Sequence, residues 1–151
     1  MKKTDELVQE IADREAIRDL SDRYCDCIWR KDLEGLVNLF TEDGVFRVEG
    51  LEVEAVARGR KKLRKVFEKA AEELEPRLFI HSRIVDLVDA NRAKGRCYVE
   101  VFSANVGMRR VGFGYYEDEY ARIKDVWKFV SRRYFLDVID STVSLRDTFM
   151  V

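Results

Sequence analysis

Histidine and proline are nearly missing from this 151-residue chain, which has one of each, His81 and Pro76. A zinc site needs several His and Cys ligands at suitable spacing, and one His with three scattered Cys does not supply them. One proline and no Gly/Ser-rich stretch leave no candidate for a linker. We therefore expect a single domain over residues 1–151, with no metal and no other cofactor.

Long apolar runs and phosphate-binding loops are missing as well. No apolar run comes near the ~20 residues that a transmembrane helix needs, and the opening MKKTDELVQEIADRE has no apolar core of a secretion signal. Gly112-Phe113-Gly114 is not followed by the Lys and Ser/Thr of a phosphate loop. With 28 Lys+Arg against 29 Asp+Glu, the formal net charge is -1. These features predict no nucleotide, no nucleic-acid partner and no membrane association.

Cysteine is present in a pattern that fits neither redox nor metal chemistry. Cys25, Cys27 and Cys97 are odd in number, and Cys25-Asp-Cys27 lacks the two-residue spacer of redox and zinc motifs. We interpret them as reduced, mostly structural thiols of a cytoplasmic protein.

Three helices are predicted in the first half of the chain. From Thr4 to about Lys31 there is no Gly or Pro. Apolar residues recur there at steps of three and four residues, and they are Ile17, Leu20, Tyr24, Cys27 and Ile28. A shorter helix is predicted around 32–40, before the turn residues 42–44. A third helix is predicted at 59–75, where Pro76 stops it.

Strands account for most of the remaining sequence. Alternating residues predict short strands at 45–48 and 51–56. Four longer stretches rich in Val, Ile, Phe and Tyr follow and predict an antiparallel meander, at 78–88, 96–104, 109–123 and 126–138. Helices at the front and strands at the back indicate an α+β fold, in which a curved sheet has helices across one face. Such an arrangement tends to leave a pocket between the two layers.

Several stretches together resemble the SnoaL-like branch of the nuclear-transport-factor-two-like superfamily. They are EAIRDLSDRY at 15–24, KDLEGLVNLFTEDGVF at 31–46, His81, and GYYEDEYARIKDVWKFVSRR at 114–133. The resemblance implies a cone-shaped, cystatin-like fold with three N-terminal helices on a strongly curved sheet and an internal cavity. The family contains scytalone dehydratase, a dehydrochlorinase, a bile-acid dehydratase, ketosteroid isomerase and non-catalytic ligand-binding modules, so the fold leaves the chemistry open.

The resemblance implies that a histidine on the strand at 78–88 is a general base, supported by an Asp at the end of the first helix. The matching histidine is His81, and an imidazole suits proton abstraction near neutral pH. Trp29 stands at the position of the Asp, and Ser103 stands where scytalone dehydratase has a second catalytic histidine. Neither side chain can carry the proton at neutral pH. A core or interface histidine is the alternative interpretation of His81.

Asp22 and Asp26 precede Trp29 on one helical face. They are either substitutes for the missing acid or members of an exposed ion-pair row with Arg30. We expect that His81 and Trp29 line a cavity between the helices and the sheet and that no carboxylate contacts His81.

Two tyrosines are candidate ligand contacts. Tyr116 alternates with Gly112, Gly114 and Asp118 in a row that faces the cavity in the family, and the two glycines are expected to leave space beside its hydroxyl. Tyr24 lies on the buried stripe of the first helix, and its hydroxyl is expected to reach the pocket. Core packing is the alternative for both. Arg132 and Arg133 are interpreted as polar residues of exposed strands.

We interpret the chain as a cofactor-independent lyase of the dehydratase type, or an isomerase, that acts on a hydrophobic small molecule. His81 is the expected base, and Tyr24, Trp29, Ser103 and Tyr116 are the expected substrate contacts. The alternatives are a non-catalytic binding or assembly module of the same fold, and a structural protein similar to the small subunit of ring-hydroxylating dioxygenases. We also expect a homo-oligomer, a dimer or trimer, formed through the outer sheet face, where the aromatic residues Tyr98, Phe102, Phe129 and Phe135 are expected.

Overall fold

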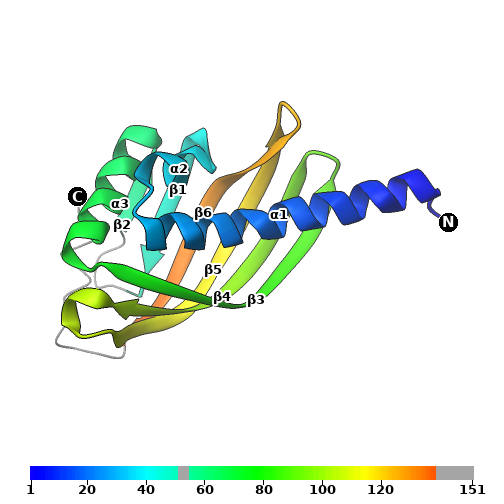
Figure 1. Cartoon of the computed structure of the whole chain (residues 1–151). Coiled ribbons are helices and arrows are strands. Elements are labelled where there is room, and N and C mark those ends of the chain that lie inside the picture. Colours follow the sequence, from blue (N-terminus) through cyan, green and yellow to red (C-terminus); the bar gives the residue numbers. More distant parts are fainter. Residues whose placement is uncertain (51–54, 139–151) are drawn as a thin grey trace.

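A long first helix crosses one face of a six-stranded sheet in the computed structural model of the chain, which describes residues 1–50 and 55–138 (Figure 1). The helices are α1 (Thr4–Arg30), α2 (Leu33–Asn38) and α3 (Arg60–Glu73). The strands are β1 (Phe40–Glu49), β2 (Ala55–Arg58), β3 (Pro76–Asp89), β4 (Arg92–Ser103), β5 (Arg109–Ile123) and β6 (Val126–Val138).

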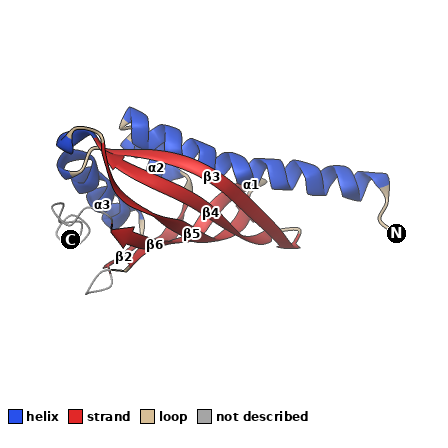
Figure 2. Ribbon diagram, turned by 90° about the horizontal axis from the view of Figure 1, so that it is seen from below, coloured by secondary structure: helices blue, strands red, loops and turns tan. Residues whose placement is uncertain are grey.

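The sheet runs in the order β2-β1-β6-β5-β4-β3. The hairpins from β3 to β6 pair in antiparallel fashion, whereas β1 runs parallel to β6. The three helices lie on one side of the curved sheet, and none of the described helices covers the other side (Figure 2). We call the side that carries the helices the inner face and the opposite side the outer face.

Helix α1 is fixed to the sheet by a buried acid as well as by its apolar stripe. Ile17, Leu20 and Tyr24 are buried, as the periodicity predicts. Asp13 is also buried, and it accepts hydrogen bonds from Trp127 Nε1 (3.1 Å) and Arg122 Nη1 (2.8 Å) on the β5–β6 hairpin. The turns of α1 before Asp13 project beyond the hairpin ends (Figure 1).

The predicted α+β cone is confirmed, with small differences at the ends of its elements. The second helix is shorter than predicted because the chain already joins the sheet at Phe40, which pairs with Phe129 of β6. Of the strand predicted at 51–56, residues 51–54 lie outside the described residues, and 55–56 belong to β2. Over the described ranges, no helix is long and apolar enough to cross a membrane.

Candidate functional site

His81 does not line a cavity between the helices and the sheet, so this expectation is wrong. Its side chain is 56% exposed, and its Nε2 lies 2.6 Å from Glu100 Oε2. Glu100 also accepts a hydrogen bond from Arg110 Nη1 at 2.8 Å. The expectation that no carboxylate contacts His81 is therefore wrong as well, and the carboxylate is neither Asp22 nor Asp26. Asp22 instead pairs with Arg83 at 2.6 Å.

The alternation of side chains along β3 explains this placement. Leu78 is buried and Ile80 packs against the core, so these two residues face the helices and His81 faces away. A one-residue difference in position moves a side chain from one face of a sheet to the other. The similarity of this sequence to the family did not show which face of β3 carries His81.

Trp29 lies next to the last residue of α1, and its side chain is partly exposed. Its indole N–H donates to the backbone oxygen of Leu78 at 2.8 Å, and its ring meets Phe79 edge-on with centroids 5.5 Å apart. The other β3 side chain that meets the indole ring is that of Arg77, whose guanidinium carbon lies 5.3 Å from the ring centroid. Neither Phe79 nor Arg77 can exchange a proton at neutral pH. The acid–base pair that the resemblance implies has no counterpart at this junction.

Ser103 closes the end of α3. It is buried, and its hydroxyl donates to the backbone oxygen of Leu74 at 2.5 Å, which satisfies one of the free carbonyls at a helix C-terminus. Its hydroxyl is thus used in the fold and is not brought to Tyr24 or Tyr116.

A charged pair lies at the centre of the inner face, where the sequence suggested only tyrosines. The side chains of Arg132 on β6 and Asp118 on β5 are both 0% exposed, with Arg132 Nε 2.9 Å from Asp118 Oδ1. Arg132 Nη2 donates to Ser21 Oγ of α1 at 3.1 Å, and Tyr120 donates to Asp118 Oδ2 at 3.0 Å. Buried charges need such partners, because leaving water is costly for each of them.

Aromatic rings enclose the guanidinium group. Its carbon lies 3.8 Å from the ring centroid of Tyr116, 4.3 Å from that of Tyr24 and 4.5 Å from that of Phe129. These distances are well within the range of cation–π attraction. We call Arg132, Asp118, Ser21, Tyr24, Tyr116 and Tyr120 the interior polar centre. It brings together two of the predicted contacts, Tyr24 and Tyr116, and leaves out His81, Trp29 and Ser103.

Burial controls the protonation of this centre. It raises the pKa of Tyr24 to about 12 and that of Tyr116 well above its ordinary value. Burial also raises the pKa of Asp118, against the opposing effect of Arg132. For Arg132, burial acts to lower the pKa, but Asp118 and the surrounding phenols outweigh it and raise the pKa. The centre therefore presents hydrogen-bond donors at neutral pH.

Gly114 of β5 does not leave open space beside Tyr116. A Cβ at Gly114 would lie 1.9 Å from the backbone oxygen of Phe135, so the glycine is there because β6 approaches closely. The expectation of an open volume at that point is wrong.

A mainly apolar pocket of about 230 Å³ lies instead between the three helices. It is lined by Cys27, Ile28, Lys31, Asp32, Leu33, Leu36, Phe67, Glu68, Ala70, Ala71, Glu72 and Pro76, and we call it the helix pocket. Its wall reaches the interior polar centre through Phe67, whose ring meets Tyr24 edge-on at 6.0 Å. Ile28 follows Tyr24 by one turn of α1 on the same side.

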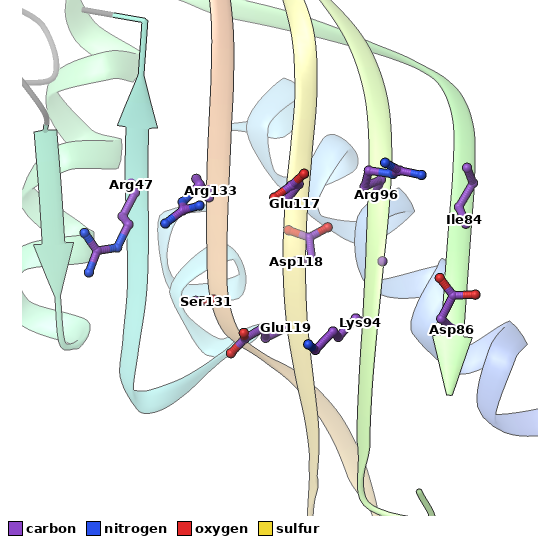
Figure 3. Close-up of a pocket in the computed structure, with 11 residues that line it drawn as sticks. Arg47, Ile84, Asp86, Lys94, Arg96, Glu117, Asp118, Glu119, Ser131 and Arg133 are labelled. Carbon is purple, nitrogen blue, oxygen red and sulfur yellow. The ribbon is translucent and has the colours of Figure 1, made fainter. Parts of the chain in front are cut away.

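A second hollow, of about 360 Å³, lies on the outer face and is lined mainly by charged residues (Figure 3). Arg47, Arg133, Glu117 and Arg96 form one row across four neighbouring strands. This hollow is polar and lies on the side away from the helices. No group of three or more His, Cys, Asp and Glu that could hold a metal ion is found in the part of the chain that the structure describes.

Arg132 is the candidate site residue that the sequence analysis assigned to the wrong face. Arg132 and Arg133 were interpreted together as exposed, but only Arg133 is exposed. The available signal was the alternation of Arg132 with Tyr134 and Leu136, which are buried on the same face. Alternation from Trp127 and Phe129 indicates Arg133 instead, because a bulge follows Phe129. Asp118 was correctly placed on the inward row with Tyr116.

Solved structures of similar proteins have the same fold. Rv3472 of Mycobacterium tuberculosis, described as of unknown function, is 30% identical with a TM-score of 0.77, over 96% of this chain and 83% of that one. A protein of Novosphingobium aromaticivorans, described as similar to nuclear transport factor two and cystatin-like in fold, is 24% identical with a TM-score of 0.78, over 100% and 99%. A hexachlorocyclohexane dehydrochlorinase, LinA type 2, is 18% identical with a TM-score of 0.73, over 89% and 93%.

No curated protein matches the sequence. The model of one family, described as a SnoaL-like domain, matches residues 9–133 and so covers α1 to most of β6, including both Asp118 and Arg132. The chain therefore belongs to the SnoaL-like domain family.

Proposed function

We propose that this chain binds a small apolar molecule in the helix pocket, next to the interior polar centre. The observation that carries the proposal is the contact between the two, since Phe67 lines the pocket and its ring touches Tyr24. Ligand sites are typically concave and apolar with a few placed polar groups. The helix pocket supplies the apolar wall, and the interior polar centre supplies donors.

A lyase or isomerase is the second candidate, favoured by the two buried phenols beside the guanidinium of Arg132. Donors in a dry interior stabilise negative charge that develops on a substrate oxygen. A base on the inner face would have to be a group other than His81, because the one histidine of the chain is on the outer face. The binding function comes first because it does not require such a base.

A pocket-filling substitution tests the binding proposal. Cyclic ketones, alcohols and hydrocarbons are screened by thermal shift, and affinities of the hits are measured for Ala71→Leu, which adds bulk to the pocket wall. We expect at least a tenfold loss of affinity. Lys62→Leu places the same leucine side chain on the exposed face of the same helix, away from the pocket, and we expect unchanged affinity. Equal affinities in both variants, or no stabilising compound at all, would contradict the proposal.

We also propose that copies of the chain meet through the outer face. Phe79, Tyr98 and Phe113 are large side chains there with 42%, 38% and 45% of their surface exposed. Tyr115 stacks on Phe135 at 4.8 Å and continues the aromatic surface toward β6. Phe129, which was expected in this surface, is fully buried on the inner face. Exposed apolar patches of this kind favour association with another protein surface.

A further inference from the structure

Nη1 of Arg132 has no hydrogen-bond partner among the residues that the structure describes. Nε and Nη2 are bonded to Asp118 and Ser21, but Nη1 is buried and unpaired among the described residues. A buried donor of a charged group that makes no hydrogen bond destabilises the folded chain, and native proteins keep few of them. An acceptor oxygen from outside the chain would satisfy this donor.

Charge balance indicates what kind of oxygen fits. Arg132 and Asp118 already form a neutral pair, since both side chains are completely buried and within 2.9 Å of each other. A carboxylate at Nη1 would add a second negative charge to this interior, and burying an unbalanced charge is strongly unfavourable. A neutral carbonyl oxygen accepts the same hydrogen bond without that cost.

The rings of Phe67 and Tyr24 lie between the helix pocket and the guanidinium group of Arg132. Phe67 lines the pocket and contacts Tyr24, and Tyr24 lies over the guanidinium. A ligand atom that leaves the pocket for the guanidinium group must therefore displace these two rings.

We propose that the ligand of this chain is an apolar molecule with a neutral carbonyl group, whose oxygen accepts a hydrogen bond from Arg132 Nη1 while its apolar body lies in the helix pocket. This inference rests on the proposed binding function and adds the chemical class of the ligand. It selects ketones, lactones and similar compounds over acids, amines and hydrocarbons.

Three cyclohexyl compounds of similar size test the inference on the unmodified protein. Cyclohexanone carries the carbonyl oxygen, methylenecyclohexane has a CH₂ group in its place, and cyclohexanecarboxylate carries the charged head group. We expect cyclohexanone to bind at least tenfold more tightly than either of the others. Methylenecyclohexane cannot accept the hydrogen bond from the charged donor, and cyclohexanecarboxylate would bury an unbalanced negative charge. Affinities are measured by ligand-observed NMR competition.

A second readout locates the oxygen. In protein labelled with ¹⁵N-arginine, cyclohexanone should shift the side-chain resonances of Arg132, and methylenecyclohexane should not. Equal binding of the ketone and the hydrocarbon, with no shift at Arg132, would overturn the inference while leaving the binding function intact. Failure of all three compounds to bind would also overturn the inference, and the wider thermal-shift screen tests the binding function separately.

Discussion

Arg132 and Asp118 form an ion pair whose two side chains are both fully buried, with Nε 2.9 Å from Oδ1. The pair joins β5 to β6, and the bond from Arg132 to Ser21 extends it to α1. The interior of this small domain is thus organised around charges as well as around apolar packing.

Breaking this pair should be far more destabilising than changing a surface charge. Asp118→Asn leaves the guanidinium buried without a counter-charge, and we expect a loss of ~3–5 kcal/mol in the free energy of unfolding. Glu119→Gln on the same strand is the control, because Glu119 is exposed, and it should change stability by less than ~0.5 kcal/mol. Urea unfolding measures both. Equal effects would contradict a structural role for the pair.

Removing the imidazole should have little effect on this protein. His81 and Glu100 form an exposed pair, and such pairs contribute at most ~1 kcal/mol. We expect His81→Ala to retain the wild-type affinity for any ligand of the helix pocket. A loss of binding, or the loss of a hydrogen–deuterium exchange activity on a bound ketone, would restore His81 as a functional residue.

The buried phenol of Tyr24 predicts a loss of stability at alkaline pH. Its folded-state pKa of about 12 lies above the ordinary value of 10. The contribution of Tyr24 is therefore fully present below pH 10 and is lost as the pH rises toward 12. Tyr24→Phe should reduce the fall in unfolding free energy over this interval, and phenolate absorbance should show one buried tyrosine fewer. An identical alkaline profile in the variant would show that Tyr24 is not buried.

The outer face should control association of the chain. Tyr98→Glu places a charge on the exposed aromatic surface, and we expect it to shift the protein toward the 17.8 kDa monomer in sedimentation equilibrium. Ile11→Glu is the control, since Ile11 is an apolar residue of α1 that is more exposed than Tyr98. Dissociation by the control variant alone would move the interface to the helix. A wild-type protein that is monomeric at micromolar concentration would rule out the association.

The architecture could be predicted from the sequence because its signals are local. Apolar spacing located α1 and α3, and long β-branched and aromatic stretches located β3 to β6. The end of the second helix was predicted less accurately. Phe40 belongs to β1 because it pairs with Phe129, and local sequence does not reveal a contact between residues so far apart in the chain.

The site could be predicted only in part, for a reason that lies in strand register. Tyr116 and Asp118 were placed correctly because β5 alternates regularly around them. His81 and Arg132 were each assigned to the wrong face, and both strands contain an irregularity in pairing close to these residues. A bulge changes which residues face the core, and it leaves little trace in composition.

The most direct test of this account is a crystal structure of the protein with the tightest-binding ketone from the thermal-shift screen. The account predicts the ligand among Ile28, Leu36 and Phe67, with its oxygen within hydrogen-bond distance of Arg132 Nη1. A ligand bound on the outer face, against His81 and Glu100, would contradict it.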